Sequence, residues 1–337
     1  MPVVRVVREE KHLPSKGVTQ MTTVIAVDLG GTNLRTALID SDATVLAYTA
    51  TRTPTRGPSG QVITDAIIAR IEALLASPQG REVAGDIAVI GVGSAGPLDL
   101  GRGWVTNSPN IAFPVVEITE PLRERFGLPV ALINDARAGV LGERWAGAAR
   151  DSENVVYVTL STGIGGGAVV NGRLLLGVSG NAGEVGHLSV DTHYNLTCGC
   201  GLIGHWEGYA SAKYVPQFFA AWREEADIRR VAFDATSARK IFEAARAEDP
   251  VALAFMEALG QVNARGVSNI IVAYNPDVIV LDGPLAQFHG DIVIRHMEPY
   301  IDRYLTLPRI VVSGLAGRAP LLGAAFYALD TQQEGSE

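Results

Sequence analysis

Two glycine-rich turns in the chain have residue types suited to binding phosphate. The first, Gly30-Gly31-Thr32-Asn33, follows Asp28 at the end of an apolar, β-branched run. Glycines let backbone amides approach phosphate oxygens closely, and a carboxylate beside them can hold hydrated Mg²⁺. The alternative interpretation is a plain tight hairpin with a capping aspartate, because Gly-Gly turns are common in hairpins.

The second glycine-rich turn lies in residues 159–167, which read TLSTGIGGG. A dinucleotide-binding fingerprint would need a helix after the glycines and an acidic residue about 20 positions later. Here the glycines lead into an apolar run and then into Asn171-Gly172, a pair typical of a β-hairpin. This strand–turn–strand context disfavours a nicotinamide-linked oxidoreductase and favours a second phosphate-binding turn facing the first.

Asn134-Asp135 stands where a strand is expected to end and an alanine-rich helix to begin. Ligand sites in α/β proteins favour the carboxyl ends of strands, and an aspartate there can accept a proton from a substrate hydroxyl. The alternative is a helix N-cap, which asparagine and aspartate both serve well. On the residues alone, the N-cap interpretation is the stronger one.

Cysteine and histidine are concentrated between residues 184 and 207, in the motifs EVGH, CGCG and GHWE. This segment holds both cysteines and three of the six histidines. His187, Cys198, Cys200 and His205 are candidates for a tetrahedral zinc site, with His193 as a substitute. The alternatives are a Cys198–Cys200 disulfide, which is strained at that separation, or two thiols that bind nothing.

Composition excludes several other classes of protein. The formal net charge of −8 argues against a general binder of nucleic acid or anionic membranes. None of the four lysines lies in a glycine-rich turn, so a P-loop is excluded. The chain has no secretory signal and no apolar run long enough to cross a bilayer, and its two cysteines cannot form a disulfide scaffold. We therefore expect a cytoplasmic protein.

The elements that must position these motifs form two sets. Apolar runs predict strands over residues 24–28, 34–39, 45–51, 87–93 and 130–133, with helices over 61–76 and 135–148. The second set has strands over 155–160, 168–170, 174–176 and 278–281, and helices near 207–223, 237–247, 250–273 and 318–328. The strand, glycine turn, strand and hairpin order recurs, which indicates a weak architectural repeat. We expect mixed sheets flanked by helices, with a ligand between the two halves.

Together these motifs resemble those of ROK-family sugar kinases, in the hexokinase–actin-like superfamily. The matching segments are DLGGTN, GSAGPLD, SPN, IND, STGIGGG, EVGH, CGCGLIGHWE and GLAGRAPLLGAA, covering about residues 24–328. The resemblance implies an α/β, two-domain actin-like (ribonuclease H-like) ATPase fold with an interdomain cleft. Residues 21–134 plus 318–333 would form the small N-terminal domain, residues 135–317 the large domain with a zinc-binding loop, and residues 1–20 a tail.

The same resemblance implies ATP-dependent phosphorylation of a hexose, with glucose as the first choice, and Asp135 as the general base. The implied sugar contacts are Asn110, Asn134, Asp135, Glu184, His187 and Glu207. The implied contacts of Mg-ATP are Asp28 for the metal and Gly30, Gly31, Thr32, Asn33, Thr162, Gly163, Gly165 and Gly283 for the nucleotide. His187 would bind a structural Zn²⁺ through one ring nitrogen and face the sugar with the other. The chain departs from the family at His205, where a third cysteine is usual, and at Leu281-Asp282-Gly283-Pro284, which replaces a glycine-rich stretch that in the family lies near the nucleotide.

Other functions remain as alternatives. Within the family these are an N-acetylhexosamine kinase, a fructokinase and a polyphosphate glucokinase. A sugar-responsive transcription regulator is disfavoured, because we expect the 27 residues before Asp28 to be too few for a DNA-binding domain. The expected partners are a hexose and ATP, with no nucleic acid and no membrane, and the family implies a homo-oligomer, either a dimer or a tetramer.

Overall fold

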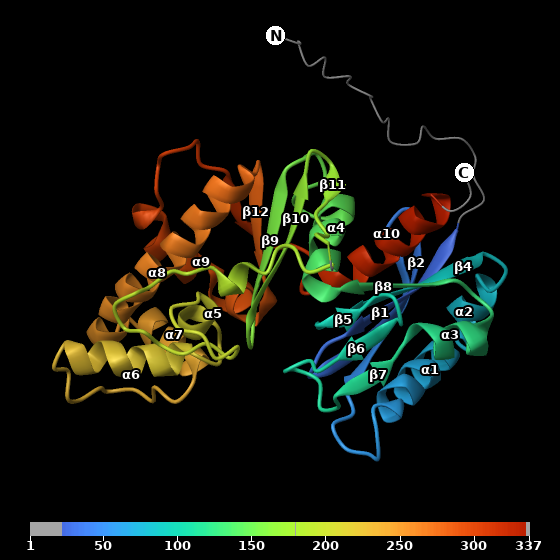
Figure 1. Cartoon of the computed structure of the whole chain (residues 1–337), viewed down its shortest axis with the longest axis horizontal. Coiled ribbons are helices and arrows are strands. Elements are labelled where there is room, and N and C mark those ends of the chain that lie inside the picture. The colour runs from blue at the N-terminus through green and yellow to red at the C-terminus, as the bar shows by residue number, and fades with distance from the viewer. Residues whose placement is uncertain (1–21, 179, 335–337) are drawn as a thin grey trace, which may run out of the picture.

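The computed structural model describes residues 22–178 and 180–334, which form two lobes that are each built on a five-stranded sheet (Figure 1). The tail expected for residues 1–20 lies outside the described residues. The first sheet has the order β3-β2-β1-β4-β8 and consists of β1 (Thr23–Leu29), β2 (Asn33–Asp40), β3 (Val45–Arg52), β4 (Ile87–Ser94) and β8 (Val130–Asn134). The second has the order β11-β10-β9-β12-β13 and consists of β9 (Val155–Leu160), β10 (Ile164–Val170), β11 (Arg173–Leu174), β12 (Val278–Asp282) and β13 (Arg309–Val312).

The remaining elements flank these sheets. A small third sheet in the first lobe joins β5 (Leu98–Asp99), β6 (Trp104–Thr106) and β7 (Val115–Glu117). The helices of the first lobe are α1 (Gln61–Leu75), α2 (Pro78–Glu82) and α3 (Thr119–Phe126). Those of the second are α5 (Glu207–Ala210), α6 (Val215–Glu225), α7 (Ala238–Arg246), α8 (Pro250–Tyr274) and α9 (Gly283–Met297), with 3₁₀ turns η1 (Val185–His187) and η2 (Glu298–Tyr300). Helices α4 (Asp135–Ala146) and α10 (Ala319–Glu334) lie between the two sheets (Figure 1).

The two large sheets share one topology, which confirms the expected repeat. In each, three strands form an antiparallel meander, and two more strands add in parallel beside the first strand of the meander. The glycine turns occupy the same place in both, between β1 and β2 and between β9 and β10. The two predicted phosphate-binding turns are therefore structurally equivalent.

The core of each lobe has two layers, because successive side chains of the central strands point to opposite faces of the sheet. On β1, Ile25 and Val27 pack with residues of α1 and α3, whereas Val24 and Ala26 pack with residues of α10. On β9, Val156 and Val158 face the helices of the second lobe, whereas Tyr157 packs against α4. Successive side chains of a strand point to opposite faces, so each sheet is covered on both sides.

Helices α4 and α10 cross closely where the lobes meet. At Gly323 of α10, an added Cβ would lie 1.6 Å from the carbonyl oxygen of Ala138 on α4, so only glycine permits this approach. Because Asp135 is the first residue of α4, this crossing fixes its position relative to both sheets.

Some predicted elements differ in the structure. The single helix predicted over residues 207–223 is wrong. The backbone is extended at Ser211, which separates α5 from α6. Helix α6 begins at Val215 with Pro216 in its first turn, where proline is tolerated. Helices α2, α3 and α9, strand β13 and the small β5–β7 sheet were not predicted from the sequence. Within the described part of the chain, none of the helices has the length and apolar character that a membrane span needs.

Candidate functional site

The first glycine turn is a tight hairpin packed against the SPN segment. The Gly30 amide donates to the carbonyl of Asn33 at 3.0 Å, and the Thr53 hydroxyl donates to the Gly30 carbonyl at 2.6 Å. A Cβ added at Gly31 would lie 2.2 Å from the carbonyl oxygen of Asn110. The structure thus brings Asn110, expected to contact sugar, beside the turn expected to contact phosphate.

Asp28 is buried at the end of β1 and pairs with an arginine that sequence reasoning missed. Arg35 is its direct cross-strand neighbour on β2, and its Nη1 donates to Asp28 Oδ2 at 2.6 Å. Burial raises the pKa of Asp28, while the Arg35 charge and its hydrogen bond lower that pKa. Magnesium in phosphate-transfer sites is held by one or two carboxylates together with substrate phosphates, and Asp28 offers one such carboxylate beside the first glycine turn.

The second glycine turn is held by residues from two distant parts of the chain. The Ser161 amide donates to the carbonyl of Gly163 at 2.9 Å and closes the turn. The amide of Ile164 donates to Glu207 Oε2 at 3.0 Å, so the carboxylate of Glu207, expected to contact sugar, contacts this turn. Gly283 lies against the same strand end, because an added Cβ would be 2.6 Å from the Leu160 carbonyl oxygen.

Asn134 and Asp135 have different roles at the start of α4, and the N-cap interpretation applies to Asn134. Asn134 Oδ1 accepts from the amides of Ala136 and Arg137 at 3.0 and 3.3 Å, so Asn134 is the N-cap of α4. Asp135 is the first helical residue, and its Oδ1 accepts from the Ala136 amide at 2.8 Å. Because Asn134 caps the helix, the Asp135 carboxylate is not needed as the N-cap and is available to contact a substrate.

The electrostatic surroundings of Asp135 favour its proton-bound form. Burial, together with the negative charges of Asp28 and Glu184, raises the pKa of Asp135 to about 6, against the opposing effects of the Ala136 amide and Arg137. A carboxylate whose pKa lies just below neutrality is suited to general-base catalysis. Asp28, Asp135 and Glu184, which come from three separate motifs, are therefore close enough to interact electrostatically.

Four side chains that can bind a metal come together from the end of η1 and the loop that follows it. His187, Cys198, Cys200 and His205 offer atoms that all lie within 4.8 Å of one another. His187 Nδ1 is 3.3 Å from His205 Nδ1 and 3.8 Å from Cys198 Sγ, and Cys200 Sγ is 3.2 Å from His205 Nδ1. A tetrahedral zinc ion needs about 3.3 Å between two nitrogens and about 3.6 Å between nitrogen and sulfur.

The donor set therefore fits a structural zinc. Burial raises the pKa of Cys198 to about 11, so its thiolate needs a nearby cation. His193, the alternative ligand, does not join this group: its Nε2 contacts Glu225 Oε1 at 2.8 Å instead. The structure describes no disulfide between the cysteines.

Another buried carboxylate lies behind the second turn, at the departure from the family pattern. Asp282 is 1% exposed and accepts from the Tyr157 hydroxyl at 2.9 Å and from Gln287 Nε2 at 2.8 Å. Burial raises the pKa of Tyr157 well above its usual value, and the charge of Asp282 and its hydrogen bond to that hydroxyl raise the pKa further. This side chain is committed to contacts within the fold, and Gly283 is the residue that borders the turn.

Sequence reasoning also missed Arg137, which is 1% exposed and bonds to the half-exposed Glu184. A signal existed, because an arginine within the apolar run 136–142 must either disrupt the core or find a buried partner. Arg35 had a signal too, because a hairpin centred on residues 31 and 32 pairs it with Asp28.

Comparisons with known proteins agree on one family. A model of the ROK family matches residues 24–331. A glucokinase from Aeropyrum pernix is 35% identical over 294 residues, covering 85% of this chain and 88% of that protein. A crystal structure of a ROK hexokinase from Thermus thermophilus has a TM-score of 0.76 at 31% identity, covering 93% of this chain and 100% of that one. A ROK family glucokinase from Streptomyces griseus, crystallised with glucose and AMPPNP, has a TM-score of 0.72 at 29% identity, covering 91% and 99%.

Proposed function

The chain belongs to the ROK family, and from this premise we propose that it is a glucokinase that transfers the γ-phosphoryl group of ATP to glucose, giving glucose 6-phosphate. The observation that carries the proposal is the place of Asp135, the first residue of α4 after its Asn134 N-cap, within electrostatic reach of Asp28 and Glu184. The glucokinase names of similar proteins, and the glucose and AMPPNP bound to one of them, support the substrate pair.

In this reaction Asp135 is the general base. It accepts the proton of the sugar hydroxyl as the oxygen attacks phosphorus, and it must therefore be ionised beforehand. Its position at the start of α4, where the two lobes meet, supports a role at a reaction between a sugar and a nucleotide. Closing the lobes around both substrates would exclude water, which otherwise competes as an acceptor.

The two equivalent turns contact the nucleotide phosphates through backbone amides and hydroxyls. Thr32 and Thr162 are both exposed in these turns, so their hydroxyls are accessible. The nucleotide contacts are Gly30, Gly31, Thr32, Asn33, Thr162, Gly163, Gly165 and Gly283. Asp28 would hold Mg²⁺, which neutralises phosphate charge during transfer.

The sugar contacts are Asn110, Asn134, Asp135, Glu184, His187 and Glu207. Zinc held by His187, Cys198, Cys200 and His205 would orient the sugar pocket and take no part in the transfer. The Nδ1 atom of His187 lies among the metal ligands, which leaves its Nε2 to face the sugar. A metal that fixes a ligand's ring in this way acts as an organiser of the site.

We also propose that residues 21–134 with 318–333 form the small domain and residues 135–317 the large one. The packing of α10 on the first sheet and of α4 on the second supports this division.

The protein acts on small molecules and forms a dimer or a tetramer. It works in the cytoplasm, where reducing conditions keep a Cys198 and Cys200 zinc site intact.

The test is a coupled assay of ADP release by the purified chain with Mg-ATP. Glucose, mannose, fructose, N-acetylglucosamine and N-acetylmannosamine are compared, and polyphosphate is tried as the donor with glucose. We expect glucose with ATP to give the highest kcat/KM. A higher value for another sugar or donor would reassign the substrate, and ADP release that no sugar stimulates would reject the kinase assignment.

A further inference from the structure

Arg137 is a buried cation that links the helix of Asp135 to the loop of Glu184. It is the third residue of α4 and is 1% exposed. A guanidinium removed from water needs hydrogen-bond partners for its rigid set of donors, or the fold is strongly destabilised. The identity of those partners therefore shows what Arg137 holds in place.

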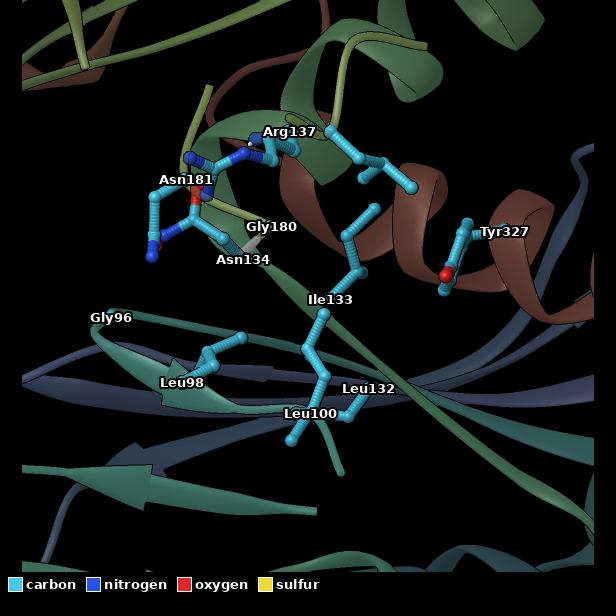
Figure 2. A pocket seen from close by; sticks show the side chains of 11 residues that line it. Gly96, Leu98, Leu100, Leu132, Ile133, Asn134, Arg137, Gly180, Asn181 and Tyr327 are labelled. Carbon is cyan, nitrogen blue, oxygen red and sulfur yellow. Dashed lines mark hydrogen bonds between the residues drawn. The ribbon is translucent and has the colours of Figure 1, made fainter. Parts of the chain in front are cut away.

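Two partners of the guanidinium lie in the segment between β11 and η1. Arg137 Nε donates to the carbonyl of Ala182 at 3.0 Å, and Nη2 donates to Glu184 Oε1 at 3.3 Å. Figure 2 shows the Arg137 side chain leaving α4 toward the segment that carries Gly180 and Asn181, beside Asn134. One planar group thus fixes both the backbone of this segment and the carboxylate at its end.

Three glycines near Glu184 make such a tie useful, because glycine positions are costly to order. Gly177, Gly180 and Gly183 all have positive φ, between 72° and 87°, and glycine loses more conformational freedom on ordering than other residues. Glu184 itself is 47% exposed, so its carboxylate is open to a ligand on one side while Arg137 holds the other.

We propose that Arg137 is a positioning residue for hexose recognition, which holds the Glu184 carboxylate where it accepts a sugar hydroxyl. This inference rests on the proposed function, since Glu184 is a sugar contact there. Lysine cannot replace Arg137, because a single ammonium on a flexible stem does not present two fixed donors to Ala182 and Glu184. Arg137 acts on sugar affinity through Glu184 and does not contact the phosphates.

The test measures glucose binding by calorimetry without ATP, and separately the KM values for glucose and ATP. We expect Arg137→Gln to weaken glucose binding about 10- to 100-fold, as loss of a hydrogen bond to a charged group implies. The KM for ATP should change less than about 3-fold. Arg137→Lys should fold, because it keeps the charge, yet should bind glucose several-fold more weakly than the natural protein.

A double-mutant cycle with Glu184→Gln separates positioning from general support of the fold. If Arg137 acts through Glu184, the double variant binds glucose within about 2-fold of Glu184→Gln alone. The matched control is Arg144→Gln on the same helix, since Arg144 donates Nε to the Ser152 carbonyl at 3.1 Å and Nη1 to the Gly172 carbonyl at 3.0 Å. It should lower stability and leave glucose binding unchanged.

Several results would overturn the inference. These are multiplicative effects of the two substitutions, equal increases in both KM values, or normal glucose binding by Arg137→Lys. Failure of the proposed function is a distinct result, because the natural protein would then show neither glucose binding nor glucose phosphorylation.

Discussion

The Glu207 carboxylate accepts a hydrogen bond from the Ile164 amide at 3.0 Å, which joins the Cys/His loop to the second glycine turn. Its other oxygen, Oε1, lies 3.6 Å from the sulfur of Cys198. A single side chain therefore lies between the proposed metal centre and the proposed phosphate contacts. Changes at the metal should consequently reach the nucleotide as well as the sugar.

Removal of the metal should weaken the binding of both substrates. We expect Cys198→Ser, or treatment with a strong chelator, to abolish bound zinc, lower the melting temperature and raise the KM for glucose by about 10-fold or more. The KM for ATP should rise too, because Glu207 follows the proposed ligand His205 by two residues and holds the Ile164 amide of the second glycine turn. Metal analysis, melting curves and the two KM values measure this. His193→Asn is the control and should retain its zinc, and natural protein that is folded, active and free of zinc would contradict the prediction.

Substitution of Gly163 should disturb the turn through Glu207. A Cβ at this position would lie 2.4 Å from Glu207 Oε2, so Gly163→Ala must displace that carboxylate from the Ile164 amide. We expect the KM for ATP to rise about 10-fold, with a smaller effect on melting temperature. Gly85→Ala is the control, because nothing lies within 4 Å of its added Cβ. An unchanged KM for ATP in Gly163→Ala would show that the Glu207 contact does not support nucleotide binding.

Replacement of the proposed base should affect turnover far more than binding. Asp135→Asn keeps the shape of the side chain and an oxygen that can accept from the Ala136 amide, but it cannot take up the hydroxyl proton. We expect kcat to fall about 10²- to 10⁴-fold with little change in glucose affinity. Steady-state kinetics and calorimetry measure the two effects. Turnover close to that of the natural protein would mean that another group is the base.

Much of the fold could be predicted from the sequence, because long apolar runs and glycine turns are local signals. The strands around Asp28 and Leu160 are of this kind, as is the Asn171-Gly172 hairpin, where both residues have positive φ. The small β5–β7 sheet could not be predicted, because strands of two or three residues carry no measurable period. Helix α9 could not be predicted, because it begins at a glycine and its helical backbone is interrupted at His289.

The site was predictable in its residue types and less so in its contacts. Histidine and cysteine spacing identified the four candidate ligands whose side chains the structure brings together. The partner of Glu207 could not be predicted, because a backbone amide 43 residues away leaves no mark in the sequence. Tyr157 and Asp282 are likewise 125 residues apart, and only the parallel pairing of β9 with β12 brings them together.

The pH dependence of activity should reflect Asp135. Its pKa of about 6 is set by burial, Asp28 and Glu184, which raise it, and by the Ala136 amide and Arg137, which lower it. The base must be ionised to act, so kcat/KM for glucose should rise with pH, reach half of its plateau at about pH 6 and level off above about pH 7. Asp135→Asn should remove this limb from the residual rate.

Stability should depend on Asp135 in the opposite direction. Folding raises the pKa of Asp135 from 3.8 to about 6. Its contribution to the free energy of unfolding is therefore fully present at pH values below the pKa of the unfolded state. That contribution is lost as the pH rises through the pKa of the folded state. The loss is at most about 3 kcal/mol, at 1.36 kcal/mol for each pKa unit. At pH 7 we therefore expect Asp135→Asn to melt at a higher temperature than the natural protein, and at pH 4 to show little difference. Melting curves at the two pH values measure this, and an Asp135→Asn variant that is less stable at pH 7 would mean that the ionised carboxylate stabilises the fold.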